Sequence, residues 1–140
     1  MIKRIRSVLK YVLAGDALDK KKYRRASELM KESKYLAGPA YSRASLFEFN
    51  LRAALAAKLN GDPNAALQEV GAAKKKIKLL NSLNDLEKEY LGIYCQIFEM
   101  ECGDPRDDES IDTGRIKVLL NNGGVRQRFK RQYPVELYRP

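Results

Sequence analysis

Residues 61–73, which read GDPNAALQEVGAA, decide the fold class of this chain. Gly61 and Asp62 are typical of a turn, and Asp62 suits the cap of a helix that begins at Pro63. The helix carries small and apolar residues on one face: Ala66, Val70, Ala73, Ile77 and Leu80. The spacing predicts an amphipathic helix that packs closely against a neighbour.

The same pattern occurs earlier in the chain at a nearly constant spacing. Forty positions before Ala66, Val70 and Ala73 stand Ala26, Met30 and Ser33. A second pair of positions, Ala53-Ala54 and Leu91-Gly92, is separated by thirty-eight. A fixed period of this length is typical of stacked helical hairpins, which usually serve as surfaces for other proteins.

The first 35 residues predict two helices. Residues 2–13 place Ile2, Ile5, Leu9, Val12 and Leu13 at helical spacing, with Lys3, Arg4, Arg6 and Lys10 mostly on the other side. This helix ends at Gly15-Asp16 or runs on towards Lys22. Lys10 interrupts the apolar stretch, which argues against a signal peptide. Gly38-Pro39 stops the second helix.

Further helices follow as far as Gly103. The third is expected to begin near Ser42 and to end at Leu59, and the fifth to run from Asn84 or Asp85 to near Gly103. Short loops make neighbouring helices antiparallel. No run of apolar residues is long enough for a transmembrane helix. Residues 115–120 could form either a strand or a short helix.

The stretch Gly61–Leu67, with Val70 and Ala73, resembles the second helix of a tetratricopeptide repeat, and Leu91-Gly92 is similar to a pair in its first helix. The resemblance covers about residues 8–103 and implies an all-α stack of antiparallel helical hairpins in a right-handed superhelix. Three features differ from that family: the period is 38–40, Asn50 replaces a large aromatic residue, and the closing proline is missing. An unrelated all-α bundle is the alternative.

Charge divides the chain into blocks. Residues 1–35 hold eleven Lys/Arg against four Asp/Glu, whereas residues 36–103 hold eight of each sign. We expect a helical-repeat domain over 1–103, an acidic linker over 104–113, and a basic tail over 114–140 that packs as a cap. This organisation predicts one neutral scaffold with basic ends.

Catalysis is not expected from these residues. The chain has no histidine, and it lacks the phosphate-binding, metalloprotease and serine-hydrolase motifs. Two cysteines, Cys95 and Cys102, lie too far apart on one helix for a disulfide and are too few for a zinc site. We therefore expect no cofactor, no metal and a reduced, cytoplasmic protein.

The expected function is a protein-protein interaction module, an adaptor or scaffold that receives a peptide or helix of a partner in a groove. If the third helix follows the tetratricopeptide pattern, its polar residues that face this groove are Glu48, Arg52 and Lys58. Basic runs at residues 20–25 and 74–78 would favour an acidic partner if they came together.

The alternative function is nucleic-acid binding by the C-terminal segment. Its cationic residues are Arg126, Arg128, Lys130 and Arg131, which alternate with Phe129 and Tyr133. Guanidinium groups beside aromatic rings suit phosphate contacts and base stacking. The same spacing also predicts a helix in which Val125, Phe129 and Tyr133 pack on the scaffold.

Overall fold

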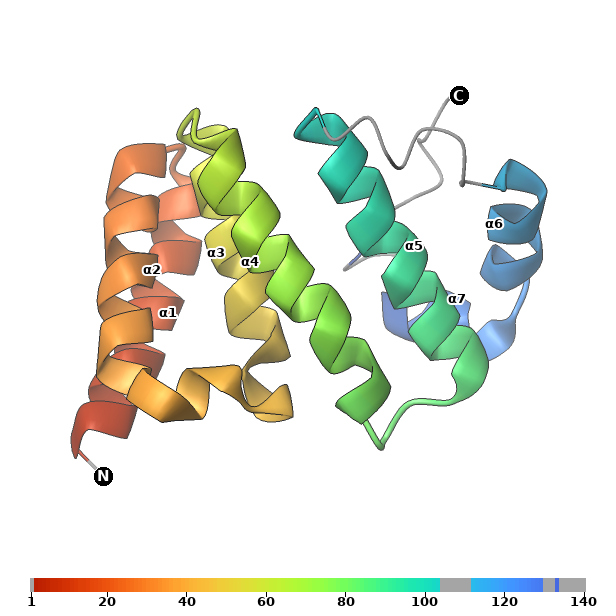
Figure 1. Ribbon diagram of the computed structural model, residues 1–140, viewed down its shortest axis with the longest axis horizontal. Coiled ribbons are helices and arrows are strands. Elements are labelled where there is room, and N and C mark those ends of the chain that lie inside the picture. The colour runs from red at the N-terminus through yellow and green to blue at the C-terminus, as the bar shows by residue number, and fades with distance from the viewer. Residues whose placement is uncertain (1, 104–111, 130–132, 134–140) are drawn as a thin grey trace. The chain divides into compact units, whose positions relative to one another are not determined.

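The computed structural model describes residues 2–103, 112–129 and 133, and these residues form seven α-helices and no strand. The all-α prediction is confirmed, with helices that pack as sequential antiparallel neighbours (Figure 1). The chain divides into two compact units, residues 1–76 and 77–140. α5, which the repeat pattern grouped with the preceding helices, belongs to the same unit as α6 and α7.

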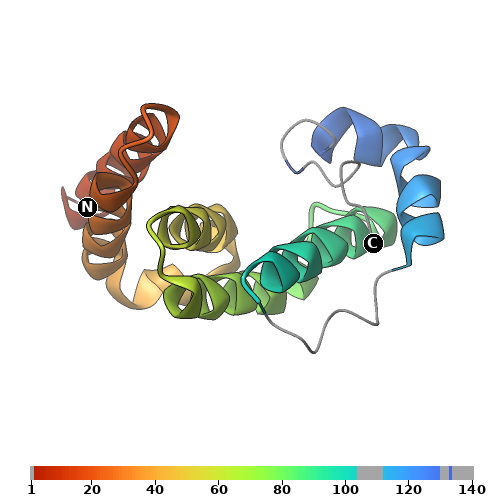
Figure 2. The same cartoon turned by 90° about the horizontal axis from the view of Figure 1, so that it is seen from above.

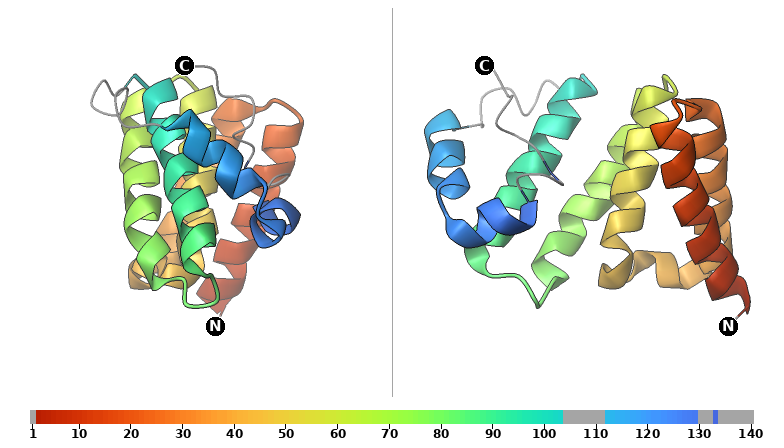
Figure 3. Two further views of the ribbon diagram at one scale, coloured as in Figure 1. Left: turned by 90° about the vertical axis from the view of Figure 1, so that its right-hand side faces the viewer. Right: turned by 180° about the vertical axis from the view of Figure 1, so that it is seen from behind.

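The first unit begins with the antiparallel pair α1 (Ile2–Asp19) and α2 (Tyr23–Ala37), seen side by side in Figure 3. The turn between them places Lys21 at a positive φ of 59°. α2 ends as predicted, because Gly38 takes a φ of 56° and its N–H group bonds to the carbonyl of Lys34.

The third helix begins later than the sequence indicated. Two short 3₁₀ helices, Gly38–Ser42 and Ala44–Leu46, precede α3 (Phe47–Leu59). The hydroxyl of Ser42 donates to the carbonyl of Pro39 at 2.9 Å instead of capping an α-helix. The expected start near Ser42 was therefore wrong by about one turn.

α3 and α4 (Pro63–Lys76) form the second antiparallel pair of this unit. Asp62 caps α4 as predicted, since its carboxylate accepts the backbone N–H of Ala65 at 3.2 Å. The repeated signature residues are buried on both α2 and α4: Ala26, Met30 and Ser33, then Ala66, Val70 and Ala73. Small residues at these positions let neighbouring helices approach closely.

The second unit contains α5 (Asp85–Glu101), α6 (Thr113–Leu120) and α7 (Gly123–Phe129). Asn84 and Glu87 form a capping box at the start of α5, with bonds of 2.8 and 3.0 Å. Residues 115–120 are helical, which settles the open choice between strand and helix. Figure 2 shows α6 and α7 beside α5.

The C-terminal residues pack on α5 through aromatic rings. Phe129 stacks on Tyr90 with centroids 6.0 Å apart, and Tyr133 meets Tyr94 edge-on at 5.0 Å. α7 is described as far as Phe129, and Val125, Phe129 and Tyr133 are all buried. Most of the expected acidic linker, residues 104–111, lies outside the described residues.

Candidate functional site

α1 packs on the rest of its unit through small residues and through Tyr11, whose ring stacks on a phenylalanine of α3 with centroids 4.1 Å apart. Ser7, Ala14 and Ala17 are buried against the rest of the unit. Ser7 and Ser33 exchange hydrogen bonds, each hydroxyl donating to the other's backbone carbonyl at 2.8 Å. An amphipathic helix usually turns its large apolar residues to the core. Here the close approach to α2 uses the opposite side.

Six large apolar residues of α1 face solvent instead of the core. We call this surface the α1 apolar face, and its members are Ile2 (74% exposed), Ile5 (62%), Val8 (46%), Leu9 (53%), Val12 (55%) and Leu13 (41%). At about 100° per residue they occupy an arc of roughly 140°, which no polar residue of positions 2–13 enters. Contiguous exposed apolar surface of this kind is typical of interaction sites.

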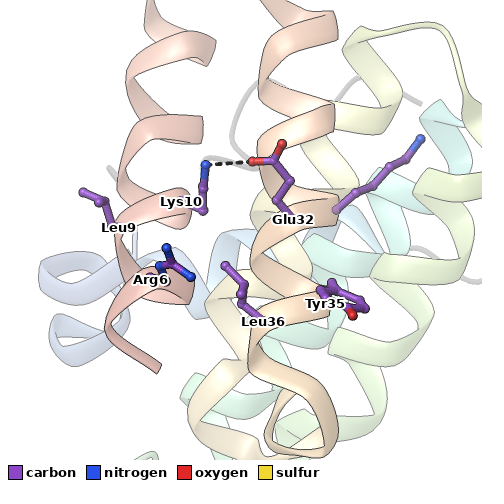
Figure 4. A pocket seen from close by; sticks show the side chains of 7 residues that line it. Arg6, Leu9, Lys10, Glu32, Tyr35 and Leu36 are labelled. Atoms are coloured by element: carbon purple, nitrogen blue, oxygen red, sulfur yellow. Dashed lines mark ion pairs between the residues drawn. The ribbon is translucent and has the colours of Figure 1, made fainter. Parts of the chain in front are cut away.

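A groove runs along one side of this face, between α1 and α2. Its volume is about 640 Å³, and its lining residues are Arg6, Leu9, Lys10, Lys31, Glu32, Tyr35 and Leu36. Figure 4 shows these side chains coming from both helices, with Lys10 paired to Glu32 at 3.0 Å. Tyr35 is 85% exposed. We call this the Tyr35 groove.

A second groove lies on the other side of α1, where α2 turns into the 3₁₀ helices. It has a volume of about 530 Å³, and α1 contributes Lys3, Arg4 and Val8 to it. Arg43 and Phe49 line the opposite wall. None of its lining residues is acidic. We call this the Arg43 groove. Both grooves lie within the range of about 300–1,000 Å³ typical of ligand sites.

A buried polar cluster lies elsewhere in the first unit, centred on Glu69. Its carboxylate accepts hydrogen bonds from Lys34 at 3.1 Å, Tyr41 at 3.0 Å and Asn50 at 2.8 Å. Lys76, only 6% exposed, donates to the carbonyl of Tyr41 at 2.5 Å and to the side-chain oxygen of Asn50. The cluster therefore links α2, the first 3₁₀ helix, α3 and α4.

The electrostatics of this cluster follow from its burial. Burial lowers the pKa of Lys76, an effect that Glu69 opposes and Lys34 increases. Burial also raises the pKa of Tyr41, and the neighbouring Glu69 raises it further. The cavity beside Glu69 measures only about 50 Å³, too small for a ligand. The polar groups pair with one another, so we assign this cluster to the stability of the fold.

The predicted groove residues of α3 do not line either groove. The guanidinium carbon of Arg52 lies 3.8 Å from the ring centroid of Tyr11, and its Nη1 donates to the Tyr11 carbonyl at 2.9 Å. This residue therefore holds α1 against α3. Glu48 and Lys58 are half-buried on the same helix. Their role in partner binding stays a prediction.

The predicted nucleic-acid residues are described only in part. Arg126 and Arg128 are exposed on α7, and Arg128 pairs with the buried Glu87 at 3.2 Å. Lys130 and Arg131 lie outside the described residues. Of the two described cations, Arg128 therefore forms an ion pair within the second unit.

The apolar stripe of α1 was predicted from the sequence, but its exposure to solvent was not. The exposed Tyr35 was not predicted either. The opposite side of the helix carries the signal from which the exposure of the stripe could have been predicted. Ser7, Ala14 and Ala17 form a line of small residues there, which is the pattern that permits close packing. The first 15 residues also contain no Asp or Glu. Tyr35 alone carries no such signal.

No protein-family model matches the chain, and neither a curated protein nor a solved structure is similar enough to match it. None of the helices in the described part combines the length and apolar character that crossing a bilayer requires. Within that part, no three histidine, cysteine or acidic side chains come together as metal ligands would.

Proposed function

We propose that this protein is a non-catalytic interaction module, an adaptor or scaffold that binds a peptide or helix of a partner protein. The observation that carries the proposal is the α1 apolar face, with a groove on each side of it. Six large apolar residues on one helix are in contact with water, which is unfavourable. Burying their apolar surface is favourable by about 25 cal/mol for each Å². A bound segment that covers these residues would therefore be stabilised by the burial of their surface.

A tetratricopeptide-like arrangement with a right-handed superhelix is part of the same proposal. Support comes from the repeated signature, because equivalent residues of α2 and α4 are buried in equivalent helical hairpins. Arrays of such hairpins commonly present one helix of each pair to a ligand. We place the partner surface on the outer side of α1, and a role of Glu48, Arg52 and Lys58 in partner binding stays a prediction.

A displayed library of helical peptides, selected on the whole protein, tests this function. We expect the selected peptides to lose about tenfold or more in affinity against Leu9→Ser or Val12→Ser. The matched controls are Leu79→Ser and Val118→Ser, since these side chains are 51% and 57% exposed, close to Leu9 and Val12. Controls that weaken binding as much as the α1 variants would contradict the proposed surface.

A further inference from the structure

The shape of the α1 surface indicates what kind of segment covers it. The apolar face is a ridge, and the Tyr35 and Arg43 grooves are recessed on its two sides. A helix with its own apolar stripe can lie along such a ridge and place side chains in both grooves. A flat bilayer surface would meet the ridge and leave the half-buried apolar walls of the grooves, such as Leu36 and Leu46, in contact with water.

The exposed charged residues that line the two grooves are all cations. Exposed cations border both of them: Arg6 and Lys31 on the Tyr35 groove, Lys3, Arg4 and Arg43 on the Arg43 groove. The single acidic residue of either lining is Glu32, which already pairs with Lys10 at 3.0 Å. Both edges of the surface therefore offer cations to an incoming segment.

We propose that the bound segment is an acidic amphipathic helix of a partner protein, with carboxylates flanking its apolar stripe. This inference rests on the proposed function and specifies its ligand. Carboxylates on the two flanks would lie opposite Arg6 and Lys31 on one side and Lys3, Arg4 and Arg43 on the other. A second copy of this chain is disfavoured as the occupant, because it would bring the same cations against them.

Three synthetic helical peptides test the inference on the full chain. They share one leucine stripe and carry flanking Glu, Gln or Lys residues, and their affinities are measured by fluorescence anisotropy at low and physiological salt. We expect the Glu peptide to bind about tenfold or more tightly than the Gln peptide at low salt, with the difference shrinking as salt rises. The Lys peptide should bind weakest.

Variants separate charge recognition from apolar binding. Arg4→Gln combined with Arg6→Gln should weaken the Glu peptide several-fold and leave the Gln peptide unchanged. The control, Arg24→Gln with Arg25→Gln, removes two exposed cations of α2 that line neither groove and should change neither affinity. Equal loss in both double variants would mean that only net charge matters, which overturns the inference.

The remaining outcomes distinguish this inference from the proposed function. If Glu and Gln peptides bind equally and Leu9→Ser weakens both, the acidic partner is wrong and the interaction module stands. If no peptide binds, both proposals fail.

Two further measurements test the rival occupants of the α1 apolar face. Binding to phosphatidylserine vesicles that Leu9→Ser weakens would indicate a membrane. Self-association in sedimentation that Leu9→Ser abolishes indicates a second copy. Either result overturns the acidic helix.

Discussion

The side-chain amide of Asn50 on α3 donates a hydrogen bond to Glu69 on α4 across 2.8 Å, in a position only 1% exposed. Asn50 also accepts a hydrogen bond from Lys76, so a single buried residue joins a carboxylate to an ammonium group. A buried polar side chain is tolerated when all of its groups have partners. The departure of Asn50 from the tetratricopeptide pattern thus has a structural reason in this chain.

Glu69→Gln should destabilise the first unit strongly. The substitution removes the negative charge that offsets the buried ammonium of Lys76, and we expect a cost on the order of 3 kcal/mol in the free energy of unfolding. Urea unfolding followed by circular dichroism measures it. Glu28→Gln is the control, because Glu28 is half-exposed and its ion pairs are worth less than about 1 kcal/mol. Equal effects of the two variants would refute the role of the cluster.

Tyr41 should stay protonated above pH 10. Its pKa is raised above the ordinary 10.0, so the folded chain holds this proton more tightly than the unfolded chain does. The contribution of Tyr41 to the free energy of unfolding is therefore complete below pH 10 and is lost as the pH rises further. An ultraviolet titration of tyrosinate should show a late component that Tyr41→Phe reduces. A late component of the same size in Tyr41→Phe would contradict this assignment.

Phe129→Ala should destabilise the second unit by about 3–5 kcal/mol, since it removes a buried ring that stacks on Tyr90. Amide hydrogen exchange in α5 reports the loss, and exchange in α3 provides an internal reference. Arg126→Ala, exposed on the same helix, should change stability by less than about 0.5 kcal/mol. Truncation after Gly124 removes Val125, Phe129 and Tyr133 together and should have a larger effect. Unaltered protection of α5 would show that these residues do not stabilise it.

The ion pair between Glu89 and Arg115 should make the second unit sensitive to acid. Arg115 donates to both carboxylate oxygens, at 2.6 and 2.7 Å, and these bonds lower the pKa of Glu89 below 4.5. The pair's contribution is complete above pH 4.5 and is lost as the pH falls through the lowered pKa. Because both side chains are more than a third exposed, solvent screens the ion pair and its contribution to stability is small.

A double-mutant cycle of Glu89→Gln and Arg115→Gln, measured at neutral and acid pH, isolates this pair. We expect a coupling free energy at neutral pH that disappears in acid. A coupling that is the same at both pH values would mean that the interaction does not depend on the charge of Glu89.

The local signals of the sequence predicted most helix boundaries. Gly38 at the end of α2, Asp62 before α4 and Asn84 before α5 act on backbone groups within a few residues of themselves. Such interactions join residues that are close in the sequence, so they can be predicted without knowledge of distant contacts. The start of α3 was missed because Ser42 has two local options, and its hydroxyl bonds backwards to Pro39.

The sequence alone determined that the chain is helical, because apolar periodicity and capping residues are local properties. Which side of α1 is buried was decided only by tertiary structure. The stripe of Ile5, Leu9 and Val12 is the more apolar side, but the reciprocal bonds between Ser7 and Ser33 hold the other side against α2. Close packing of small residues is a property of two helices together, and no periodicity within one of them expresses it. The exposed face that we assign to partner binding follows from that choice.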